Sequence, residues 1–180
     1  MYRFAPATFD ESIVFGAAKP QYSEISVRQW LKFMQAQKID RICCLLEPKT
    51  YNRYQSDLLT AYRQTFGRER VLWQPEIADF QIPNSTILIE SIIPFLISAE
   101  QDRQKAVVHC SHGIGRTGIV LAAWLVSRRG LSNRQALSAV RQQKRLPQEA
   151  IIAALFFGKN PLHIKRQLNN LLDDCRAAFS

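Results

Sequence analysis

The residues best suited to carry out chemistry lie in one short stretch, from His109 to Gly118. It contains a cysteine, Cys110, then five residues, then Arg116 and the hydroxyl residue Thr117. An apolar run precedes the stretch and a helix-like segment follows it, which predicts a strand, a loop and a helix start. Such a loop presents backbone N–H groups and the positive end of a helix dipole to an anion. We therefore predict a phosphate cradle with a cysteine at its mouth.

The side chains of this stretch suit nucleophilic attack on phosphorus. Nearby cations and helix N-termini favour the reactive thiolate form of cysteine, so Cys110 is the predicted nucleophile. The planar guanidinium of Arg116 can hold two phosphate oxygens. Thr117 is predicted to donate a hydrogen bond to the sulfur and so to help it leave in a second step. The residues predicted to hold the phosphate through their backbone are Ser111, His112, Gly113, Ile114 and Gly115.

Cleavage of a phosphate ester also requires a proton donor for the departing oxygen. Asp79 lies upstream of the cysteine, in a loop that contains Pro75 and Pro83 and follows an apolar run. Such a loop can reach over a pocket, so Asp79 is the predicted general acid and Glu76 is the alternative. His109 is expected to orient the cysteine loop through its ring or to be a buried structural histidine.

Short apolar runs alternate with helix-like segments along the chain. The predicted strands cover residues 12–15, 41–46, 70–73 and 106–109. The predicted helices cover residues 24–38, 51–66, 85–101, 115–129, 132–144 and 161–179. This alternation predicts an α/β fold with a central, mainly parallel sheet of about four or five strands flanked by helices. We expect one domain over residues 1–180, with a catalytic core at about 12–157 and a C-terminal helix at about 161–179.

The composition is that of a globular protein with one core. Of the 180 residues, 47% are hydrophobic and 22% are charged, which is ordinary for a soluble domain. No apolar stretch has the length needed to cross a bilayer, and the N-terminus lacks the apolar core of a signal peptide. We therefore expect a cytoplasmic protein with no membrane span. Its net charge of +9 should attract anionic ligands.

The four cysteines are Cys43, Cys44, Cys110 and Cys175. No pair has the spacing of zinc ligands, and structural disulfides are not expected in a cytoplasmic protein. Buried thiols are expected at the three positions other than Cys110. The alternative is that Cys43 or Cys44 forms a reversible, protective disulfide with Cys110.

Together these motifs resemble the cysteine-dependent protein phosphatase superfamily, whose signature is His-Cys, five residues, Arg, then Ser or Thr. The match here runs from His109 to Thr117. The segment Asp79–Pro83 resembles the acid loop of compact dual-specificity-like members, and Phe15–Pro20 resembles a segment near their N-terminus. The resemblance implies the phosphatase fold and hydrolysis of phosphotyrosine, or also of phosphoserine and phosphothreonine, in a protein or peptide.

The resemblance also implies the roles of the residues. Cys110 would form a cysteinyl-phosphate, and Asp79 would protonate the leaving group and then activate water. Neither a metal ion nor an organic cofactor is expected. Relatives often use a later glutamine to position the water, and three glutamines remain open for that role: Gln142, Gln143 and Gln148.

Other functions remain as alternatives. His112 and the basic charge favour an RNA 5′-polyphosphatase, although those relatives usually have Asn where this chain has Gly115 and tend to lack Asp79. A phosphoinositide phosphatase is less favoured because the five-residue loop contains no Lys or Arg. A non-enzymatic phosphate-binding module and a sulfurtransferase are weaker still. Basic residues of the last helices either steer substrates or form a solvated face: Arg128, Arg129, Arg134, Arg141, Lys144, Arg145, Lys165 and Arg166.

Overall fold

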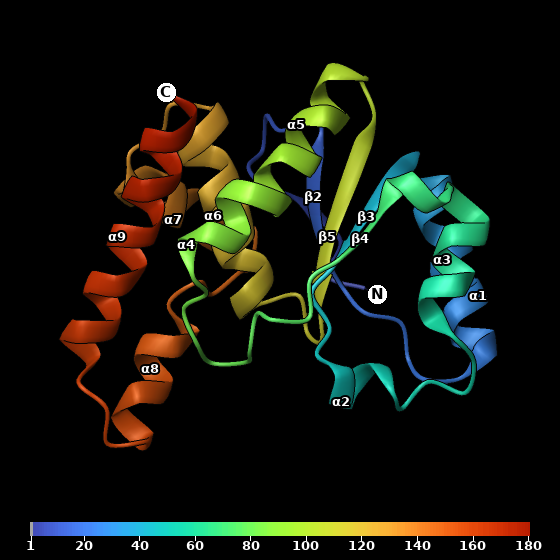
Figure 1. The fold of residues 1–180 in the computed structure, drawn as a ribbon, viewed down its shortest axis with the longest axis horizontal. Coiled ribbons are helices and arrows are strands. Elements are labelled where there is room, and N and C mark those ends of the chain that lie inside the picture. Colours follow the sequence, from blue (N-terminus) through green and yellow to red (C-terminus); the bar gives the residue numbers. More distant parts are fainter. Residues whose placement is uncertain (1) are drawn as a thin grey trace.

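A five-stranded sheet forms the centre of the molecule in a computed structural model that describes residues 2–180 (Figure 1). The strands are β1 (Ala5–Pro6), β2 (Val14–Ala18), β3 (Ile39–Cys44), β4 (Val71–Trp73) and β5 (Lys105–Cys110). Their order is β1-β2-β5-β3-β4. Only β1 is antiparallel to its neighbour, and the other pairs are parallel. The mainly parallel sheet predicted from the sequence is therefore confirmed, with β1 as an added edge strand.

Helices cover both faces of this sheet (Figure 1). On one side lie α1 (Glu24–Ala36), α3 (Leu58–Phe66) and the short α2 (Pro48–Tyr51), with a 3₁₀ turn at Arg68–Arg70. On the other side lie α4 (Ser85–Ile87), the π-helical turn Leu88–Ile92, α5 (Ile93–Gln101), α6 (Gly115–Arg128), α7 (Asn133–Gln142), α8 (Glu149–Phe156) and α9 (Pro161–Phe179). This arrangement confirms the α/β class. No helix in the described residues 2–180 has the length and apolar character needed to span a membrane.

The helix that follows the cysteine is the most deeply buried element. Every residue of α6 from Gly115 to Ser127 is buried, and α6 contacts β5, α7 and α9. The adjacent strands divide their side chains between the two faces, as the pleat requires. For example, Cys43 belongs to the core on the α6 side and Cys44 to the core on the α1 side. The cysteine stretch is therefore anchored at both ends in packed structure.

Two predicted helices differ from the structure for identifiable reasons. The predicted helix over 51–66 forms only as α3, from Leu58 to Phe66, because Asp57 caps the helix there by accepting a hydrogen bond from the Thr60 N–H at 2.9 Å. The predicted helix over 85–101 is interrupted by the π-helical turn. Pro94 cannot donate to the carbonyl of Glu90 and its ring would crowd that carbonyl, and the wider turn relieves both problems.

The structure also contains a helix that the sequence did not predict. This helix, α8, is short and largely apolar, so its sequence lacks the amphipathic period that identifies a helix. It begins directly after the segment that contacts the cysteine loop. Its far end exposes Phe156 and Phe157, which are 82% and 68% accessible.

Candidate active site

The loop Cys110–Arg116, here called the cysteine loop, joins the carboxyl end of β5 to the start of α6. β5 lies between β2 and β3, so the loop is at the middle of the sheet edge where α/β proteins commonly bind ligands. Cys110 is only 3% exposed. Its sulfur accepts a hydrogen bond from the Gly113 N–H at 3.3 Å. The loop therefore turns back on the sulfur and directs the Gly113 N–H at it, and the phosphate cradle remains a prediction.

Two glycines allow the loop to lie against β2. Gly113 has φ +70°, and a Cβ there would lie 2.4 Å from the Ala17 carbonyl oxygen, so only glycine fits. On the strand itself, a Cβ at Gly16 would lie 2.8 Å from the methyl group of Thr117. The Lys19 N–H then donates to the Cys110 carbonyl at 3.0 Å. The early segment that resembled the phosphatases thus forms one wall of the cysteine loop.

Arg116 is buried, and most of its donors are held by the scaffold. Its Nη1 donates to the Leu45 carbonyl at 3.2 Å, to Glu47 Oε1 at 3.3 Å and to the Ile77 carbonyl at 3.4 Å. Its Nη2 donates to the Ser111 hydroxyl at 3.1 Å. Nε has no hydrogen-bond partner among the described residues. The fixed Nη1 leaves the Nε–Nη2 edge of the fork as the one able to grip two phosphate oxygens.

Asp79 lies at that edge. Its Oδ1 is 3.3 Å from Arg116 Nε, and its side chain is one-third exposed. It also lines a cavity of about 440 Å³ together with Ser111 and His112 of the cysteine loop. The alternative acid, Glu76, is exposed and does not line this cavity. Asp79, and not Glu76, therefore lies beside Arg116 and the cysteine loop.

Glu47 connects these two groups, and the sequence analysis did not identify it. Its Oε1 accepts from Arg116 Nη1 at 3.3 Å and from the backbone N–H of Asp79 at 2.8 Å. Burial acts to raise its pKa, but hydrogen bonds from Lys49 and from the Asp79 backbone, with the charge of Arg116, lower the pKa below its usual value. Its place just after the end of β3, at the same sheet edge as Cys110, is the signal that could have found it.

His109 and Thr117 flank the cysteine loop, have predicted roles, and are both fully buried. His109 Nε2 and the Tyr62 hydroxyl are 3.2 Å apart, and burial lowers the pKa of His109 to about 3. His109 is therefore a neutral, buried histidine. The predicted hydrogen bond from Thr117 to the sulfur is not formed, because Thr117 Oγ1 has no partner in the described structure and its methyl packs against Gly16. Its role in the departure of the sulfur remains a prediction.

Arg145, which is not part of the cysteine loop, holds that loop in place through hydrogen bonds. The prediction that it belongs to a solvated basic face is wrong, since it is 3% exposed. Its guanidinium donates to the carbonyls of Gly113, Gly16 and Arg3. Burial lowers its pKa to about 10. Arg145 therefore ties the cysteine loop to β2 and to the N-terminal segment.

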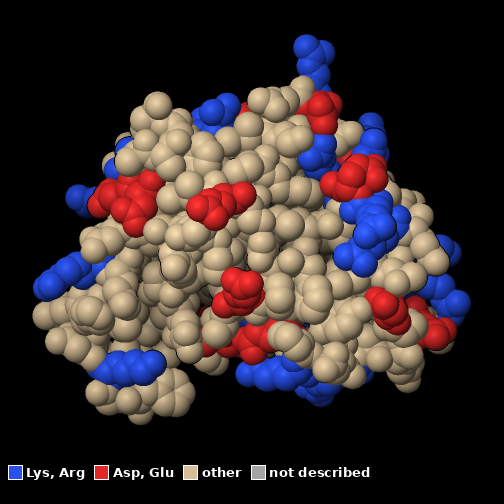
Figure 2. All heavy atoms as spheres, in the orientation of Figure 1, with Lys and Arg blue, Asp and Glu red and all other residues tan. Residues whose placement is uncertain are grey.

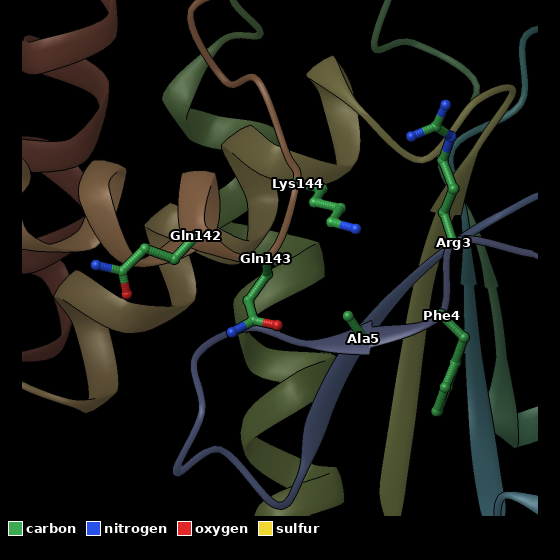
Figure 3. A pocket seen from close by; sticks show the side chains of 6 residues that line it. All are labelled: Arg3, Phe4, Ala5, Gln142, Gln143 and Lys144. Carbon is green, nitrogen blue, oxygen red and sulfur yellow. The ribbon is translucent and has the colours of Figure 1, made fainter.

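None of the three candidate glutamines lines the cavity that Asp79 lines. Gln142 and Gln143 line a separate cavity between the N-terminal segment and the end of α7 (Figure 3). Gln148 lines a groove between α7 and α9. Glu149 approaches the loop instead, because a Cβ at Gly115 would lie 2.0 Å from its Oε2. Burial, and then the charge of Asp79, raises the pKa of Glu149.

Basic side chains outside the loop surround the cavity that Asp79 lines. Arg3, Lys19 and Arg53 come from three separate segments and line it together with Tyr22. None of the three lies in the five-residue loop or in the last helices, where basic residues were noted in the sequence. Elsewhere on the face shown in Figure 2, Lys and Arg lie mostly around the edge and among carboxylates.

The cysteines offer no metal site. All four thiols are unpaired and buried, and burial raises the pKa of Cys44 to about 12. In residues 2–180 no group of three His, Cys, Asp or Glu side chains is arranged to hold a metal ion. A reversible disulfide with Cys110 remains a prediction.

The sheet topology and the cysteine loop with its buried arginine are those of the cysteine-dependent phosphatases. The family model described as "Dual specificity phosphatase, catalytic domain" matches residues 28–156. The chain belongs to this family. A search of curated proteins gives no match.

Solved structures agree with this assignment. The active form of Tk-PTP is 25% identical, with a TM-score of 0.67 over 91% of this chain and 95% of that one. A kinase associated phosphatase whose catalytic-site cysteine is replaced by serine is 22% identical, with a TM-score of 0.68 over 92% and 88%. PTPMT1 in complex with PI(5)P is 13% identical, with a TM-score of 0.70 over 98% and 99%. The last two likenesses show the fold alone.

Proposed function

We propose that this chain hydrolyses phosphotyrosine in proteins, with phosphoserine and phosphothreonine as further substrates. The observation that carries the proposal is the position of Arg116. The Nε–Nη2 edge of its guanidinium is not bound to backbone carbonyls: Nη2 donates to the Ser111 hydroxyl at 3.1 Å, and Asp79 lies 3.3 Å from Nε. A phosphate held by that edge and by the backbone N–H groups of the cysteine loop has both the sulfur and the carboxyl group close to it.

The proposed reaction has two steps. The Cys110 thiolate attacks phosphorus, the bond to the tyrosine oxygen breaks, and the Asp79 carboxyl gives its proton to that oxygen. Asp79, now a carboxylate, takes a proton from water as the water attacks the cysteinyl-phosphate. The sulfur–phosphorus bond breaks, inorganic phosphate leaves, and the thiolate is restored. Arg116 stabilises the charge on the phosphoryl oxygens in both steps, so the scheme requires no metal ion.

The test compares two cysteine variants. Cys110→Ser should abolish hydrolysis of p-nitrophenyl phosphate and of a phosphotyrosine peptide, because a serine hydroxyl is a far weaker nucleophile than a thiolate. Cys175→Ser, a change at a buried cysteine of α9, should retain activity. Circular dichroism would establish that both variants fold. Undiminished turnover by Cys110→Ser would contradict the proposal.

A phosphoinositide is the second candidate substrate. The observation that favours it is the group of basic residues around the cavity, since these supply the cations that the five-residue loop lacks. A panel of phosphotyrosine peptide, phosphothreonine peptide, phosphoinositide and 5′-triphosphorylated RNA would separate the candidates. We expect the highest kcat/KM for the phosphotyrosine peptide.

A further inference from the structure

The helix α8 buries its small side chains and exposes its large ones. Its buried residues are Ala150, Ala153 and Ala154. Five large apolar side chains of α8, of the turn after it and of the start of α9 are between 45% and 82% accessible: Ile152, Leu155, Phe156, Phe157 and Leu162. These five residues are here called the apolar tip. Soluble proteins seldom expose so many large apolar side chains together unless the surface binds a partner.

The apolar tip lies at the end of a helical hairpin with a defined turn. α8 packs against α9. Gly158 has φ +64° and lies just past the end of α8, and Asn160 caps the start of α9 by accepting hydrogen bonds from two backbone N–H groups. Figure 1 shows that this turn extends away from the sheet. The apolar side chains are therefore held on a projection from the molecule.

The same hairpin carries positive charge and no negative charge. Residues 150–172 contain Lys159, Lys165 and Arg166 but no Asp or Glu. All three cations are exposed, and within residues 2–180 none of them lies at ion-pair distance from a carboxylate. The lower left corner of Figure 2, where the hairpin lies in Figure 1, shows Lys or Arg among uncharged residues. Cations beside exposed apolar side chains are complementary to an anionic lipid surface.

Other occupants fit this surface less well. Contact between two copies of the tip would bring two sets of the same cations together in a chain whose net charge is already +9, and like charges would oppose it. A helical peptide binds in an apolar groove, whereas the tip projects. In a bilayer the apolar side chains enter the boundary of the acyl chains, and the cations remain among the anionic headgroups.

We propose that the apolar tip and the three cations bind the chain reversibly to anionic lipid bilayers. This inference goes beyond the proposed function and does not depend on which phosphate ester is hydrolysed. Phe157 lines a cavity of about 270 Å³ together with Phe80, which is the residue after Asp79. Binding through the tip therefore brings the loop that contains Asp79 close to the membrane surface.

The experiment measures sedimentation of the protein with vesicles of phosphatidylcholine alone or of an equimolar mixture with phosphatidylserine. The wild-type protein should bind the mixed vesicles and bind phosphatidylcholine much more weakly. Phe156→Ser/Phe157→Ser should weaken binding to the mixed vesicles by at least about tenfold, because each large apolar side chain removed from water contributes about that factor. The matched control is Phe9→Ser/Ile25→Ser, at side chains that are 74% and 62% exposed outside the hairpin, and it should bind like the wild type.

A second pair of variants tests the charges. Lys159→Gln/Lys165→Gln should weaken binding to the mixed vesicles by roughly tenfold to thirtyfold, because each cation near an anionic surface contributes about fivefold. Arg28→Gln/Lys32→Gln makes the same charge change at two exposed residues of α1 and should bind like the wild type. Added salt should weaken wild-type binding, since it screens the attraction to the headgroups. Circular dichroism would establish that the variants fold, and Phe156→Ser alone is the milder change.

The contrary outcomes are distinct from one another. Absence of binding to the mixed vesicles, or equal binding to both kinds of vesicle, would overturn the proposal. Equal losses in a hairpin variant and its matched control would overturn the assignment to the hairpin. Dimers in light scattering that Phe156→Ser/Phe157→Ser abolishes, without binding to vesicles, would show that the tip joins two copies of the chain instead.

Discussion

At the scale of single residues, Glu47 links the two parts of the candidate site, which are Arg116 and the loop that contains Asp79. Its carboxylate accepts from Arg116 and from the backbone of Asp79. It therefore holds the Arg116 guanidinium and the loop that contains Asp79 in fixed positions. A residue with this task acts on catalysis by positioning other groups.

Replacing Glu47 should impair catalysis while the fold remains. We expect Glu47→Gln to lower kcat/KM by about tenfold to a hundredfold, because a small displacement of catalytic groups has effects of that size. Glu76→Gln removes an exposed carboxylate from the same loop as Asp79 and should change little. Steady-state kinetics with p-nitrophenyl phosphate would measure both. Equal activity of the two variants would show that Glu47 does not position the site.

His109 should make the fold sensitive to acid. Its pKa in the folded protein is about 3, below the ordinary value of 6.5, so the unfolded chain takes up a proton at a pH where the folded chain does not. The stability present near neutral pH is therefore lost as the pH falls from about 6.5 towards 3. By pH 5 this loss should reach about 2 kcal/mol.

Urea unfolding at pH 7 and pH 5 measures this effect. His109→Gln should lose less stability between the two pH values than the wild type, because glutamine does not titrate. His163→Gln, at an exposed histidine of α9, should lose as much as the wild type. An identical loss in all three proteins would exclude His109 as the source.

The sequence identified the candidate residues that lie in recognisable local motifs and missed those that only the fold brings to the site. Cys110, Arg116 and Asp79 were predicted from local motifs, and the structure brings them together. Glu47 and Glu149 follow or begin other elements, and no local pattern marks them. Their positions depend on which strands are neighbours in the sheet, which the spacing of motifs does not give.

At the scale of elements, one arginine joins three segments. Arg145 donates to backbone carbonyls of the cysteine loop, of β2 and of the N-terminal segment. Its position just after α7 suggested a surface residue, because charged residues usually lie outside. The Arg145 guanidinium can be buried here because three backbone carbonyls accept its hydrogen bonds.

Removing these hydrogen bonds should destabilise the protein. We expect Arg145→Met to cost roughly 3 kcal/mol, since several buried carbonyls lose their donor, and to lower kcat because the loop is less firmly held. Arg141→Met, at an exposed arginine of α7, is the matched control and should cost little. Urea denaturation and activity measurements would compare them, and equal stability of the two variants would contradict the role given to Arg145.

Element boundaries were predictable where the local signal was strong. The strand β5 follows from the apolar run at residues 106–108, and the end of α6 follows from Gly130. The π-helical turn and the break at Asp57 depend on a single proline and a single cap within otherwise helical patterns. The helix α8 has a nearly uniform apolar sequence, which does not distinguish a helix from a buried strand.

At the scale of the whole molecule, the C-terminal helix is part of the core. α9 packs against α6 and α8, and its buried residues include Leu168, Leu171 and Leu172. Because α6 begins at the cysteine loop, α9 indirectly supports the candidate site. The catalytic core was expected to end at about residue 157. That boundary leaves out α9, which packs against α6.

Two leucines of α9 should differ sharply in their effect. Leu172→Ala, at a fully buried side chain, should cost about 2–5 kcal/mol through lost burial and the cavity left behind. Leu162→Ala, at a side chain that is 70% exposed, should cost less than about 0.5 kcal/mol. Thermal unfolding would measure both. Similar melting temperatures would indicate that α9 is not part of the cooperative core.

The most direct test of the central claim is to detect phosphate on Cys110. Asp79→Asn should accumulate the cysteinyl-phosphate with p-nitrophenyl phosphate, because that leaving group needs little protonation whereas attack by water requires the Asp79 base. After acid quenching, mass spectrometry of the peptide that contains Cys110 should show the added mass of one phosphoryl group. Steady hydrolysis with no phosphorylated Cys110, or with the phosphoryl group on another residue, would contradict the account.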